Sequence, residues 1–323
     1  MKKIGVGIVG YGNIGRGAEI SINNSDDMEL VAVFTRRPPN TLNIISENVD
    51  ILPIEEAFNM REKISTMILC GGSATDLPWQ SPMFAKHFNI VDSFDTHSKI
   101  SEHISKIESV ITNTTAVVSA GWDPGIFSMM RCMMSAVLPN GKNNTFWGRG
   151  VSQGHSDAIR HVEGVKNGVQ YTVPKDGAID LARNGLSVLT PRQKMYRDCY
   201  VVAEEGADRA QIESDIKNMP DYFLDYDTSV TFITEEELST NHSGMPHAGT
   251  VISVGDISGN KNVMEFSLDL ESNAIFTASI LVCYARAAAR LSAEGNYGVK
   301  TVFDIPLSYL QMNDLEKQIK ELM

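Results

Sequence analysis

Three glycines near the start of the chain have the spacing of a dinucleotide-binding turn. They are Gly10, Gly12 and Gly15 in the segment GYGNIG, which is the pattern G-x-G-x-x-G. The strand-like run Ile4–Val9 precedes them, and helix-forming residues follow. Glycines at this spacing permit a tight bend, close approach of the backbone to a pyrophosphate, and close packing of helix on strand. A glycine-rich turn without a ligand is the alternative, but the place between strand and helix favours a dinucleotide.

Two adjacent arginines, Arg36 and Arg37, follow the second strand-like run, MELVAVFT, which ends at Thr35. In an NAD site an Asp or Glu at this place accepts hydrogen bonds from the ribose 2′-hydroxyl. A guanidinium group is instead suited to phosphate, because its planar fork donates two parallel charge-assisted hydrogen bonds. The pair could also be a solvated turn. Its position 21 residues after Gly15 favours NADP over NAD.

Further strand-like runs end in loops of small or polar residues. The run STMILCGGSATD contains Gly71, Gly72 and Ser73, and FNIVDSFDTH places Asp92 and Asp95 after a strand at 89–91. Ligands of doubly wound sheets bind outside the carboxyl ends of the strands. The helical segment SEHISKIESVITN and the strand TAVVSAG continue the alternation to about residue 121. A parallel α/β layer is therefore predicted for this part.

The second half of the chain has a different pattern. From about residue 122 to 272 strand-like runs outnumber helices, which predicts a mixed or antiparallel sheet. The run FTASILVCYARAAARLSAEG predicts a long helix that ends with Gly295 as its C′ residue and returns to the first domain. We predict an α/β fold with a Rossmann-type dinucleotide-binding domain, 1–121 completed by 273–323. An α+β domain for substrate binding and dimerization is expected at 122–272.

Net charge and cysteine use restrict the class of protein. The net charge of -12 argues against nucleic acid and anionic membranes as partners. Cys70, Cys132, Cys199 and Cys283 are scattered without metal-ligand spacing, so no metal site is predicted and free thiols in a reducing compartment are expected. The N-terminal apolar run is too short for a signal peptide, and no run approaches the length of a membrane span. We expect a cytoplasmic protein.

The segment WDPGIFSMMRCMMSAVL predicts a helix with two features that have structural explanations. Asp123 before Pro124 fits an N-cap followed by a proline at the first helical position. The methionines at 129, 130, 133 and 134 have i, i+3, i+4 spacing and are expected in the core rather than in a site.

Several unusual strings occur together along the chain. At GYGNIG, TRR, SFDTH, GWDPG, FWGRGVSQGHSDA, MPDYF, GMPH and ESNAIFTAS, the chain resembles the meso-diaminopimelate dehydrogenase family. The resemblance runs from near residue 4 to beyond residue 300. It implies NADP-dependent, reversible oxidative deamination of the D-centre of meso-2,6-diaminopimelate to L-2-amino-6-oxopimelate and ammonia. It also implies a role in lysine and cell-wall precursor synthesis, and a homodimer.

The resemblance also implies a set of site residues. Those for the cofactor would be Gly10, Tyr11, Gly12, Asn13, Ile14, Gly15, Thr35, Arg36, Arg37, Cys70, Gly71, Gly72, Ser73, Ser93, Phe94, Asp95, Ala120, Gly121, Trp122, Asp123 and Pro124. Those for the substrate would be Asp95, Trp122, Asp123, Trp147, Gln153, Gly154, Thr172, Arg197, His247 and Asn273. Asp95 and Asp123 would be the catalytic residues.

The implied reaction gives these residues distinct tasks. An amine must be neutral before its carbon loses hydride, so Asp95 and Asp123 would hold the ammonium and assist its deprotonation. Two neighbouring carboxylates raise the pKa of one of them, which suits proton transfer. Arg197 would pair bidentately with the distal carboxylate, and Thr172 and His247 would add hydrogen-bond donors. Such a double-ended clamp would select one centre of a nearly symmetric molecule.

Each of these residues also has a structural interpretation. His247 could be an ordinary loop histidine, Arg197 could pair with a structural carboxylate, Trp147 could be core or interface, and Asn273 could cap a helix. Two other functions stay open. One is a dehydrogenase of broader D-amino acid range, and the other is an NADP-binding sensor without catalysis. The Asp, Arg and His residues favour an enzyme, because a sensor needs no such clamp.

Overall fold

The chain divides into two compact units in a computed structural model that describes residues 3–185 and 187–323. Unit 1 comprises Met1–Met129 and Ala274–Met323, and unit 2 comprises Met130–Asn273. Unit 1 is therefore built from two separate stretches of sequence, with unit 2 inserted between them.

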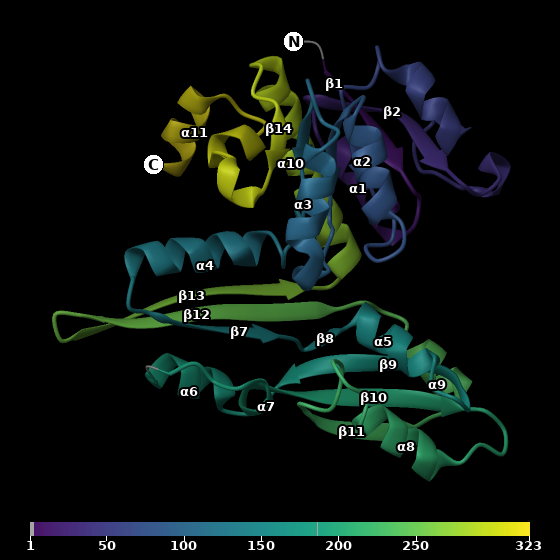
Figure 1. Cartoon of the computed structure of the whole chain (residues 1–323), viewed down its shortest axis with the longest axis vertical. Coiled ribbons are helices and arrows are strands. Elements are labelled where there is room, and N and C mark those ends of the chain that lie inside the picture. The colour runs from purple at the N-terminus through teal and green to yellow at the C-terminus, as the bar shows by residue number, and fades with distance from the viewer. Residues whose placement is uncertain (1–2, 186) are drawn as a thin grey trace. The chain divides into compact units, whose positions relative to one another are not determined.

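Unit 1 contains one parallel sheet with the doubly wound topology predicted from the sequence (Figure 1). In spatial order its strands are β14 (Gly298–Lys300), β6 (Thr115–Val117), β5 (Asn89–Asp92), β4 (Thr66–Leu69), β1 (Ile4–Val9), β2 (Met28–Thr35) and β3 (Asp50–Pro53). The chain runs outward from β1 to β2 and β3, then returns to β4 on the other side of β1. This reversal is the switch point at which such sheets bind ligands.

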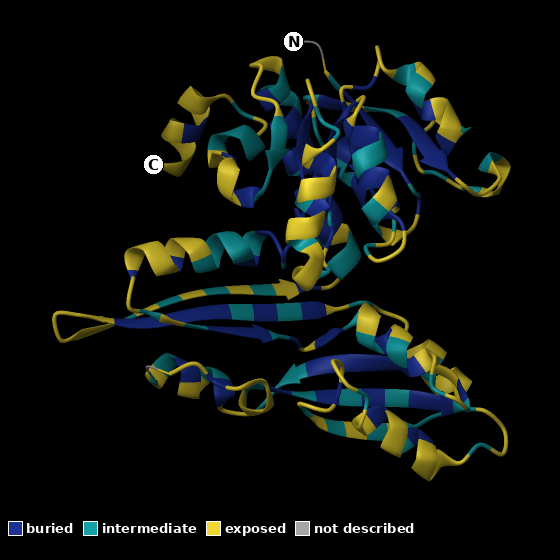
Figure 2. Ribbon diagram, viewed as in Figure 1, coloured by how far each residue is buried: buried dark blue, intermediate teal, exposed yellow. Residues whose placement is uncertain are grey.

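The central strands of unit 1, β1, β4, β5 and β6, are almost entirely buried because helices cover the sheet (Figure 2). The helices are α1 (Asn13–Asn23), α2 (Leu77–Ala85), α3 (Ile100–Glu108), α10 (Asn273–Ala293) and α11 (Leu315–Leu322). Short 3₁₀ turns lie at Pro39–Thr41, Ile54–Met60, His97–Lys99, Val302–Asp304 and Leu307–Leu310. The sequence analysis did not predict β3, a short edge strand ending in proline, because its four residues carry little periodicity.

Helix α10 corrects one expectation from the sequence. It has 21 residues, and an 18-residue window within it has a mean hydropathy of 1.4, so by length and composition it could cross a membrane, although no run of that length was expected. Eleven of its residues are buried, and the core helix of a folded unit meets the same criterion. Gly17 of α1 allows close packing here, since a Cβ at Gly17 would lie 2.8 Å from that of Ala278. Gly295, with φ +76°, follows the helix as predicted.

Unit 2 contains two sheets, whereas the sequence analysis predicted a single mixed or antiparallel one. The four-stranded sheet has the order β11 (Asp227–Phe232), β10 (Met195–Ala203), β9 (Val165–Pro174) and β8 (Gly150–Val151), and only its β10–β11 pair is parallel. The antiparallel three-stranded sheet has the order β13 (Asn260–Leu270), β12 (His247–Ile257) and β7 (Lys142–Trp147). Alternation along each strand predicts a buried face but not which strands pair.

The helices of unit 2 are short. They are α5 (Gln153–Arg160), α6 (Ala178–Asn184), α7 (Pro191–Lys194), α8 (Arg209–Lys217) and α9 (Glu235–Asn241). The sequence analysis singled out none of α6, α7 and α9, which have at most seven residues each. Buried side chains of α5, α8 and β10, including Ile159, Ile212 and Val201, form one apolar cluster.

Helix α4 (Ile126–Val137) departs from two expectations. It begins at Ile126, so the interpretation of Asp123 as N-cap and Pro124 as first helical residue is wrong. The N–H of Ile126 donates to the carbonyl oxygen of Gly121, which closes a tight loop before the helix.

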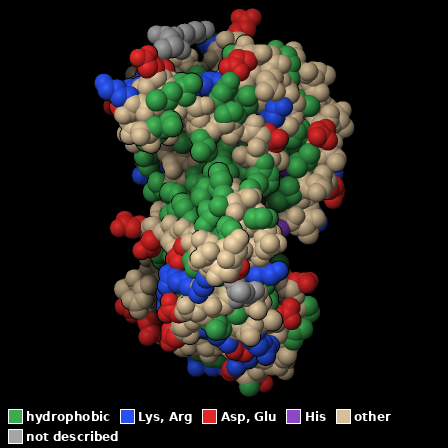
Figure 3. All heavy atoms as spheres, turned by 90° about the vertical axis from the view of Figure 1, so that its left-hand side faces the viewer, with side chains coloured by type: hydrophobic (Ala, Val, Ile, Leu, Met, Phe, Trp, Pro, Cys, Tyr) green, Lys and Arg blue, Asp and Glu red, His purple; other side chains and the backbone are tan. Residues whose placement is uncertain are grey.

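The methionines of α4 differ in burial. Met134 is buried as expected, but Met133 is 55 % exposed, because it lies on the outer side of the helix. Figure 3 shows hydrophobic side chains gathered near the middle of the face in view.

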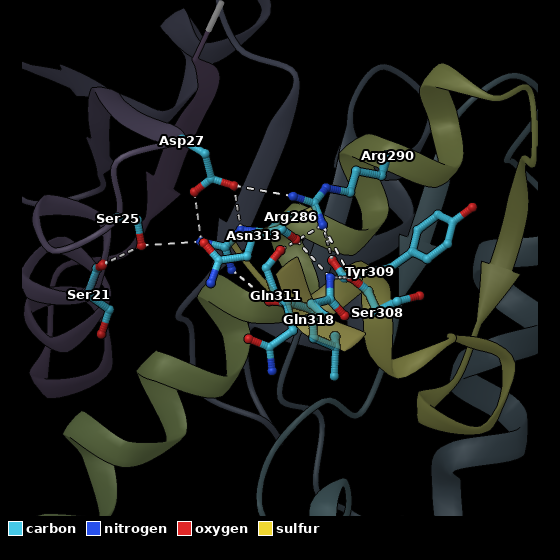
Figure 4. A network of polar contacts seen from close by, with 11 residues as sticks. Ser21, Ser25, Asp27, Arg286, Arg290, Ser308, Tyr309, Gln311, Asn313 and Gln318 are labelled. Carbon is cyan, nitrogen blue, oxygen red and sulfur yellow. Dashed lines mark hydrogen bonds and ion pairs between the residues drawn. The ribbon is translucent and has the colours of Figure 1, made fainter. Parts of the chain in front are cut away.

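Two arginines of α10 fix the C-terminal segment within unit 1 (Figure 4). Arg286 is buried, and its Nε and Nη2 donate to the carboxylate of Asp27 at 2.6 and 2.9 Å. Its Nη1 donates to the carbonyl oxygen of Leu310 at 2.9 Å. Arg290 donates from Nη1 to the carbonyl oxygen of Gln311 at 2.7 Å. The pair therefore joins the start of β2, helix α10 and the C-terminal segment.

Candidate cofactor and substrate sites

The turn between β1 and α1 presents the open N-terminus of a helix. Gly10 has φ +88°, and a Cβ at Gly15 would lie 2.3 Å from the carbonyl oxygen of Gly10, so both positions require glycine. Gly12 is the N-cap of α1, and a Cβ there would have no neighbour within 4 Å. The first turn of α1 carries no acidic residue. The N–H groups at the start of a helix and the partial positive charge of that end are suited to an anion.

A cavity of about 320 Å³ lies beside this turn. It brings together predicted cofactor residues from the glycine turn, the end of β2 and the loop after β4. They are Gly10, Tyr11, Gly12, Thr35, Arg36, Arg37, Cys70, Gly71 and Gly72. Asn13, Ile14 and Gly15 form the first turn of α1 next to them. Burial raises the pKa of the Cys70 thiol to about 12, so this thiol is neutral.

The two arginines at the end of β2 have different surroundings. The backbone N–H of Arg37 donates to Thr35 Oγ1 at 3.0 Å, and its Nη2 donates to the carbonyl oxygen of Tyr11. Arg36 is 57 % exposed and pairs with Asp76 at 2.8 Å. Arg37 therefore lies against the glycine turn, and Arg36 is partly neutralised by a carboxylate that the sequence analysis did not single out.

A buried carboxylate on α1, Glu19, fixes Tyr11 and the loop before β3. The Tyr11 hydroxyl donates to Glu19 Oε2, and the N–H groups of Ile45 and Ser46 donate to Oε1 at 3.0 and 2.6 Å. Burial alone would raise the pKa of Glu19, but these hydrogen bonds outweigh it and hold the pKa below its ordinary value. The sequence carried a signal for this residue, because Glu19 stands three positions before Ile22 on the buried face of α1.

The remaining predicted residues of unit 1 lie in loops that follow three adjacent strands. Ser73 follows β4, residues 93–95 follow β5, and residues 120–124 lie after β6. The backbone N–H of Asp95 donates to Ser73 Oγ at 2.9 Å, and the Asp95 side chain is exposed. Since parallel strands end at the same edge of a sheet, these loops gather at that edge.

Unit 2 contains a buried guanidinium, that of Arg197 on β10. Arg197 stands opposite Thr172 of β9, and its Nη1 donates to Thr172 Oγ1. Its guanidinium carbon lies 3.8 Å from the ring centroid of Tyr226, and its Nε has no hydrogen-bond partner. The side chain is 6 % exposed, and this burial lowers the pKa of Arg197 below its ordinary value.

Arg197 has no carboxylate partner among residues 3–185 and 187–323. The interpretation that it pairs with a structural carboxylate is therefore wrong. A buried cation without a counterion is costly, and an anionic ligand that reached it would offset that cost.

The strands β10, β9, β8 and β12 connect Arg197 and Thr172 to His247. Thr172 on β9 stands opposite Gly150 of β8, and a Cβ at Gly150 would lie 2.5 Å from the imidazole of His247. His247 begins β12, is 7 % exposed, and has its Nδ1 at 2.9 Å from the carbonyl oxygen of Ala248. It is therefore a buried strand residue rather than a loop histidine.

The other predicted substrate residues of unit 2 lie near the start of β12. Met245 joins two of them, since its Sδ accepts from Gln153 Nε2 at 3.2 Å and its carbonyl oxygen accepts from the Asn273 N–H at 3.1 Å. Gly154 follows Gln153 in α5, and a Cβ there would meet nothing within 4 Å. Trp147 ends β7, opposite Gly249 of β12. Asn273 is the first residue of α10 rather than a residue before it.

Polar residues that the sequence analysis missed surround Arg197 and Thr172. Gln170 is fully buried and donates from Nε2 to Thr172 Oγ1 at 3.3 Å. His155 of α5 has Nδ1 at 2.8 Å from Ser152 Oγ. Burial, followed by the positive charge of Arg197, lowers the pKa of His155 to about 4. Sequence offers a weak signal for Gln170, a polar residue within the apolar strand β9.

Known proteins agree with the predicted resemblance. The profile of the family described as "Diaminopimelic acid dehydrogenase C-terminal domain" matches residues 121–272. The chain is 55 % identical to the meso-diaminopimelate D-dehydrogenase of Ureibacillus thermosphaericus, with 100 % of each chain covered. The chain belongs to the meso-diaminopimelate D-dehydrogenase family. The resemblance predicted from the sequence motifs is confirmed.

Solved structures place the meso-diaminopimelate D-dehydrogenase family on the same fold. A mutant meso-DAPDH from Clostridium tetani E88, solved with DAP, is 52 % identical with a TM-score of 0.93, covering 99 % of this chain and 100 % of that one. An engineered D-amino acid dehydrogenase bound to NADP⁺ is 38 % identical with a TM-score of 0.87, and 100 % of each chain is covered. The predicted Rossmann-type domain with a second α+β domain is confirmed.

Acid titration tests the buried state of His155. Its pKa of about 4 lies below the ordinary value of 6.5, so between these pH values the unfolded chain binds more protons. Stability is therefore lost as the pH falls from about 6.5 to about 4, by on the order of 3 kcal/mol for this residue. We expect His155→Gln to lose less free energy of unfolding than the wild type over this window, measured by urea denaturation. An unchanged pH dependence in His155→Gln would contradict the assignment.

Proposed function

We propose that this chain catalyses the NADP-dependent, reversible oxidative deamination of the D-centre of meso-2,6-diaminopimelate. The products are L-2-amino-6-oxopimelate and ammonia, and the reaction belongs to lysine and diaminopimelate biosynthesis. The buried Arg197 without a carboxylate partner among the described residues carries the proposal, because a dicarboxylic amino acid supplies the missing anion. The relative solved with DAP supports the same substrate.

We assign NADP as the cofactor. The open N-terminus of α1, with Gly12 to Gly15, would hold the pyrophosphate. Thr35, Arg36 and Arg37 would hold the 2′-phosphate, and β2 ends without the carboxylate typical of an NAD site. The relative bound to NADP⁺ supports this choice. When bound, the oxidised nicotinamide supplies the hydride acceptor. Cys70 to Ser73, residues 93–95 and residues 120–124 would line its nicotinamide end.

Asp95 and Asp123 are proposed to act on the reacting amine. Each carboxylate can accept a hydrogen bond from the ammonium, and one of them can take its proton, so that the nitrogen lone pair becomes available. Both aspartates stand in loops at the same edge of the unit 1 sheet.

Arg197, Thr172 and His247 are proposed to hold the distal carboxylate and amine. The Arg197 Nε–H is unpaired, which leaves a donor for a carboxylate oxygen. Trp122, Trp147, Gln153, Gly154 and Asn273 complete the proposed substrate set. Polar groups fixed in this way discriminate stereocentres, because a mismatched centre leaves buried donors unpaired.

The domain roles and assembly follow the family. We propose residues 1–121 with 273–323 as the NADP-binding domain, and residues 122–272 as the domain for substrate binding and dimerization. Exposed apolar side chains within unit 2, such as Met133, Val137 and Val263, support a homodimer formed through that unit. A cytoplasmic location fits a dehydrogenase with free cysteines.

Turnover measured with four substrates separates the proposed function from its alternatives. Purified protein and NADP⁺ are mixed with meso-, LL- or DD-diaminopimelate or D-alanine, and absorbance of the reduced cofactor is followed. We expect turnover with the meso isomer. Comparable rates with D-alanine would favour a broader D-amino acid dehydrogenase. Cofactor binding without turnover on any substrate would favour a sensor.

Removing both positive charges after β2 tests the cofactor assignment. Arg36→Ala with Arg37→Ala should weaken NADP binding roughly 10- to 100-fold more than NAD binding, because the 2′-phosphate loses both charged partners, whereas the two cofactors share the glycine turn that Arg37 contacts. Dissociation constants are measured by calorimetry for both cofactors. Arg61→Ala, an exposed arginine of the same unit, is the control. An equal loss of affinity for both cofactors would favour the interpretation of the arginine pair as a solvated turn.

Substitution of Arg197 tests the substrate clamp. Arg197→Met should raise KM for meso-diaminopimelate roughly 100-fold, since a buried charge-assisted contact is lost, and should leave KM for NADP unchanged. Steady-state kinetics with each substrate varied in turn give both values. Arg192→Met is the matched control, because Arg192 is 57 % exposed in the same unit. An unchanged KM for meso-diaminopimelate in Arg197→Met would rule out the clamp.

A further inference from the structure

A buried carboxylate, that of Asp92 at the end of β5, accepts four hydrogen bonds. Its Oδ2 accepts from Ser81 Oγ at 2.6 Å and from His103 Nε2 at 2.8 Å. Its Oδ1 accepts from the backbone N–H groups of Phe94 at 3.1 Å and Ser119 at 2.9 Å. Asp92 is 0 % exposed, so these four donors replace the water that the carboxylate loses on burial.

The two backbone donors belong to the loops that carry the proposed catalytic aspartates. Phe94 immediately precedes Asp95, and Ser119 opens the segment that leads to Asp123. The carbonyl oxygen of Asp92 also accepts from the Ala120 N–H at 2.8 Å. One residue therefore joins both loops through its side chain and its main chain.

The backbone of Ser119 shows why this anchor matters. Ser119 has φ +56°, a left-handed conformation that a residue with a Cβ adopts at a cost in free energy. Its N–H is held in that conformation by the Asp92 carboxylate, and the next N–H by the Asp92 carbonyl. The direction in which the chain leaves β6 toward Asp123 thus depends on Asp92.

His103 of α3 supports the anchor from the other side. Its ring stacks on Phe94, with ring centroids 4.1 Å apart and planes 11° from parallel. It is 2 % exposed, and its Nδ1 has no hydrogen-bond partner among the described residues. An apolar side chain at this buried place would avoid that cost, but it would remove a donor from the buried Asp92 carboxylate. The Nε2–H···Asp92 bond and the stack on Phe94 therefore explain a histidine here.

We infer that Asp92 and His103 form a positioning pair for the reaction, which sets the placement of the loops that carry Asp95 and Asp123. This inference rests on the proposed function of those two aspartates. Asp92 and His103 are both buried, so they act through the loops rather than on the substrate. Misplacement of a catalytic group by about 1 Å can cost roughly 100-fold in rate, so loosening this anchor should lower kcat.

Two substitutions test the pair with the full-length protein. His103→Phe keeps an aromatic ring against Phe94 and removes the donor to Asp92. Asp92→Asn keeps one acceptor oxygen and removes the negative charge. We expect kcat with meso-diaminopimelate to fall roughly 10- to 100-fold in each, and the dissociation constant for NADP to change by a smaller factor, since most of its proposed contacts lie at the glycine turn and after β2. Should Asp92→Asn fail to fold, His103→Phe decides alone.

Asn89, at the opposite end of β5, provides a matched structural control. Its Nδ2 donates to the carbonyl oxygen of Ser65 at 2.8 Å, and its Oδ1 accepts from the Thr115 N–H at 2.9 Å. Asn89→Ala removes buried hydrogen bonds from the same strand, at the end that lies away from the two loops. It should lower the free energy of unfolding while leaving kcat near the wild-type value. An equal fall in kcat in Asn89→Ala and His103→Phe would overturn the positioning role.

Amide hydrogen exchange gives a readout that does not require turnover. The N–H groups of Phe94 and Ser119 should exchange faster in His103→Phe than in the wild type, while that of Thr115 stays protected. Unchanged exchange at Phe94 and Ser119, or an unchanged kcat, would overturn the inference. Absence of wild-type turnover with meso-diaminopimelate would instead overturn the proposed function itself.

Discussion

The parallel arrangement of the strands in unit 1 determines where its chemistry can occur. Parallel strands all end at one edge, so the loops after β1, β2, β4, β5 and β6 gather there without further contacts. Gathering alone does not fix a side chain to the accuracy that catalysis needs. Buried carboxylates add restraints, since Glu19 holds Tyr11 and the loop before β3, and Asp92 holds the loops after β5 and β6.

Buried charge is used differently in unit 2. The Glu19 and Asp92 carboxylates have all their partners within the chain, whereas Arg197 has a hydroxyl, an aromatic face and one unpaired N–H. The carboxylate contacts hold loops of unit 1 in place. The surroundings of Arg197 leave a buried positive charge that an anionic ligand would stabilise. Burial without a counterion makes Arg197 selective for anions, because a neutral ligand would not offset the cost of desolvating its charge.

The sequence predicted the doubly wound sheet because Gly10, Gly12 and Gly15 have spacing that few other structures require. It could not predict the division of unit 2 into two sheets, since alternation along β9 or β12 is the same whichever strand lies beside it. The start of helix α4 was predicted wrongly at Asp123. An aspartate before a proline is typical of a helix N-cap, but here a hydrogen bond to the Gly121 carbonyl closes a loop before the helix begins. His103 was missed because a lone histidine within the amphipathic segment SEHISKIESVITN carries no motif. Only the fold brings it to Asp92.

The clamp of Arg286 on Asp27 and Leu310 has a consequence for how the chain is made. Unit 2 is a continuous stretch of sequence, so all of it is synthesised before the last fifty residues, 274–323. The sheet of unit 1 lacks its edge strand β14 and its core helix α10 until then. Unit 1, although it begins the chain, is therefore the last part of the protein that can complete its fold.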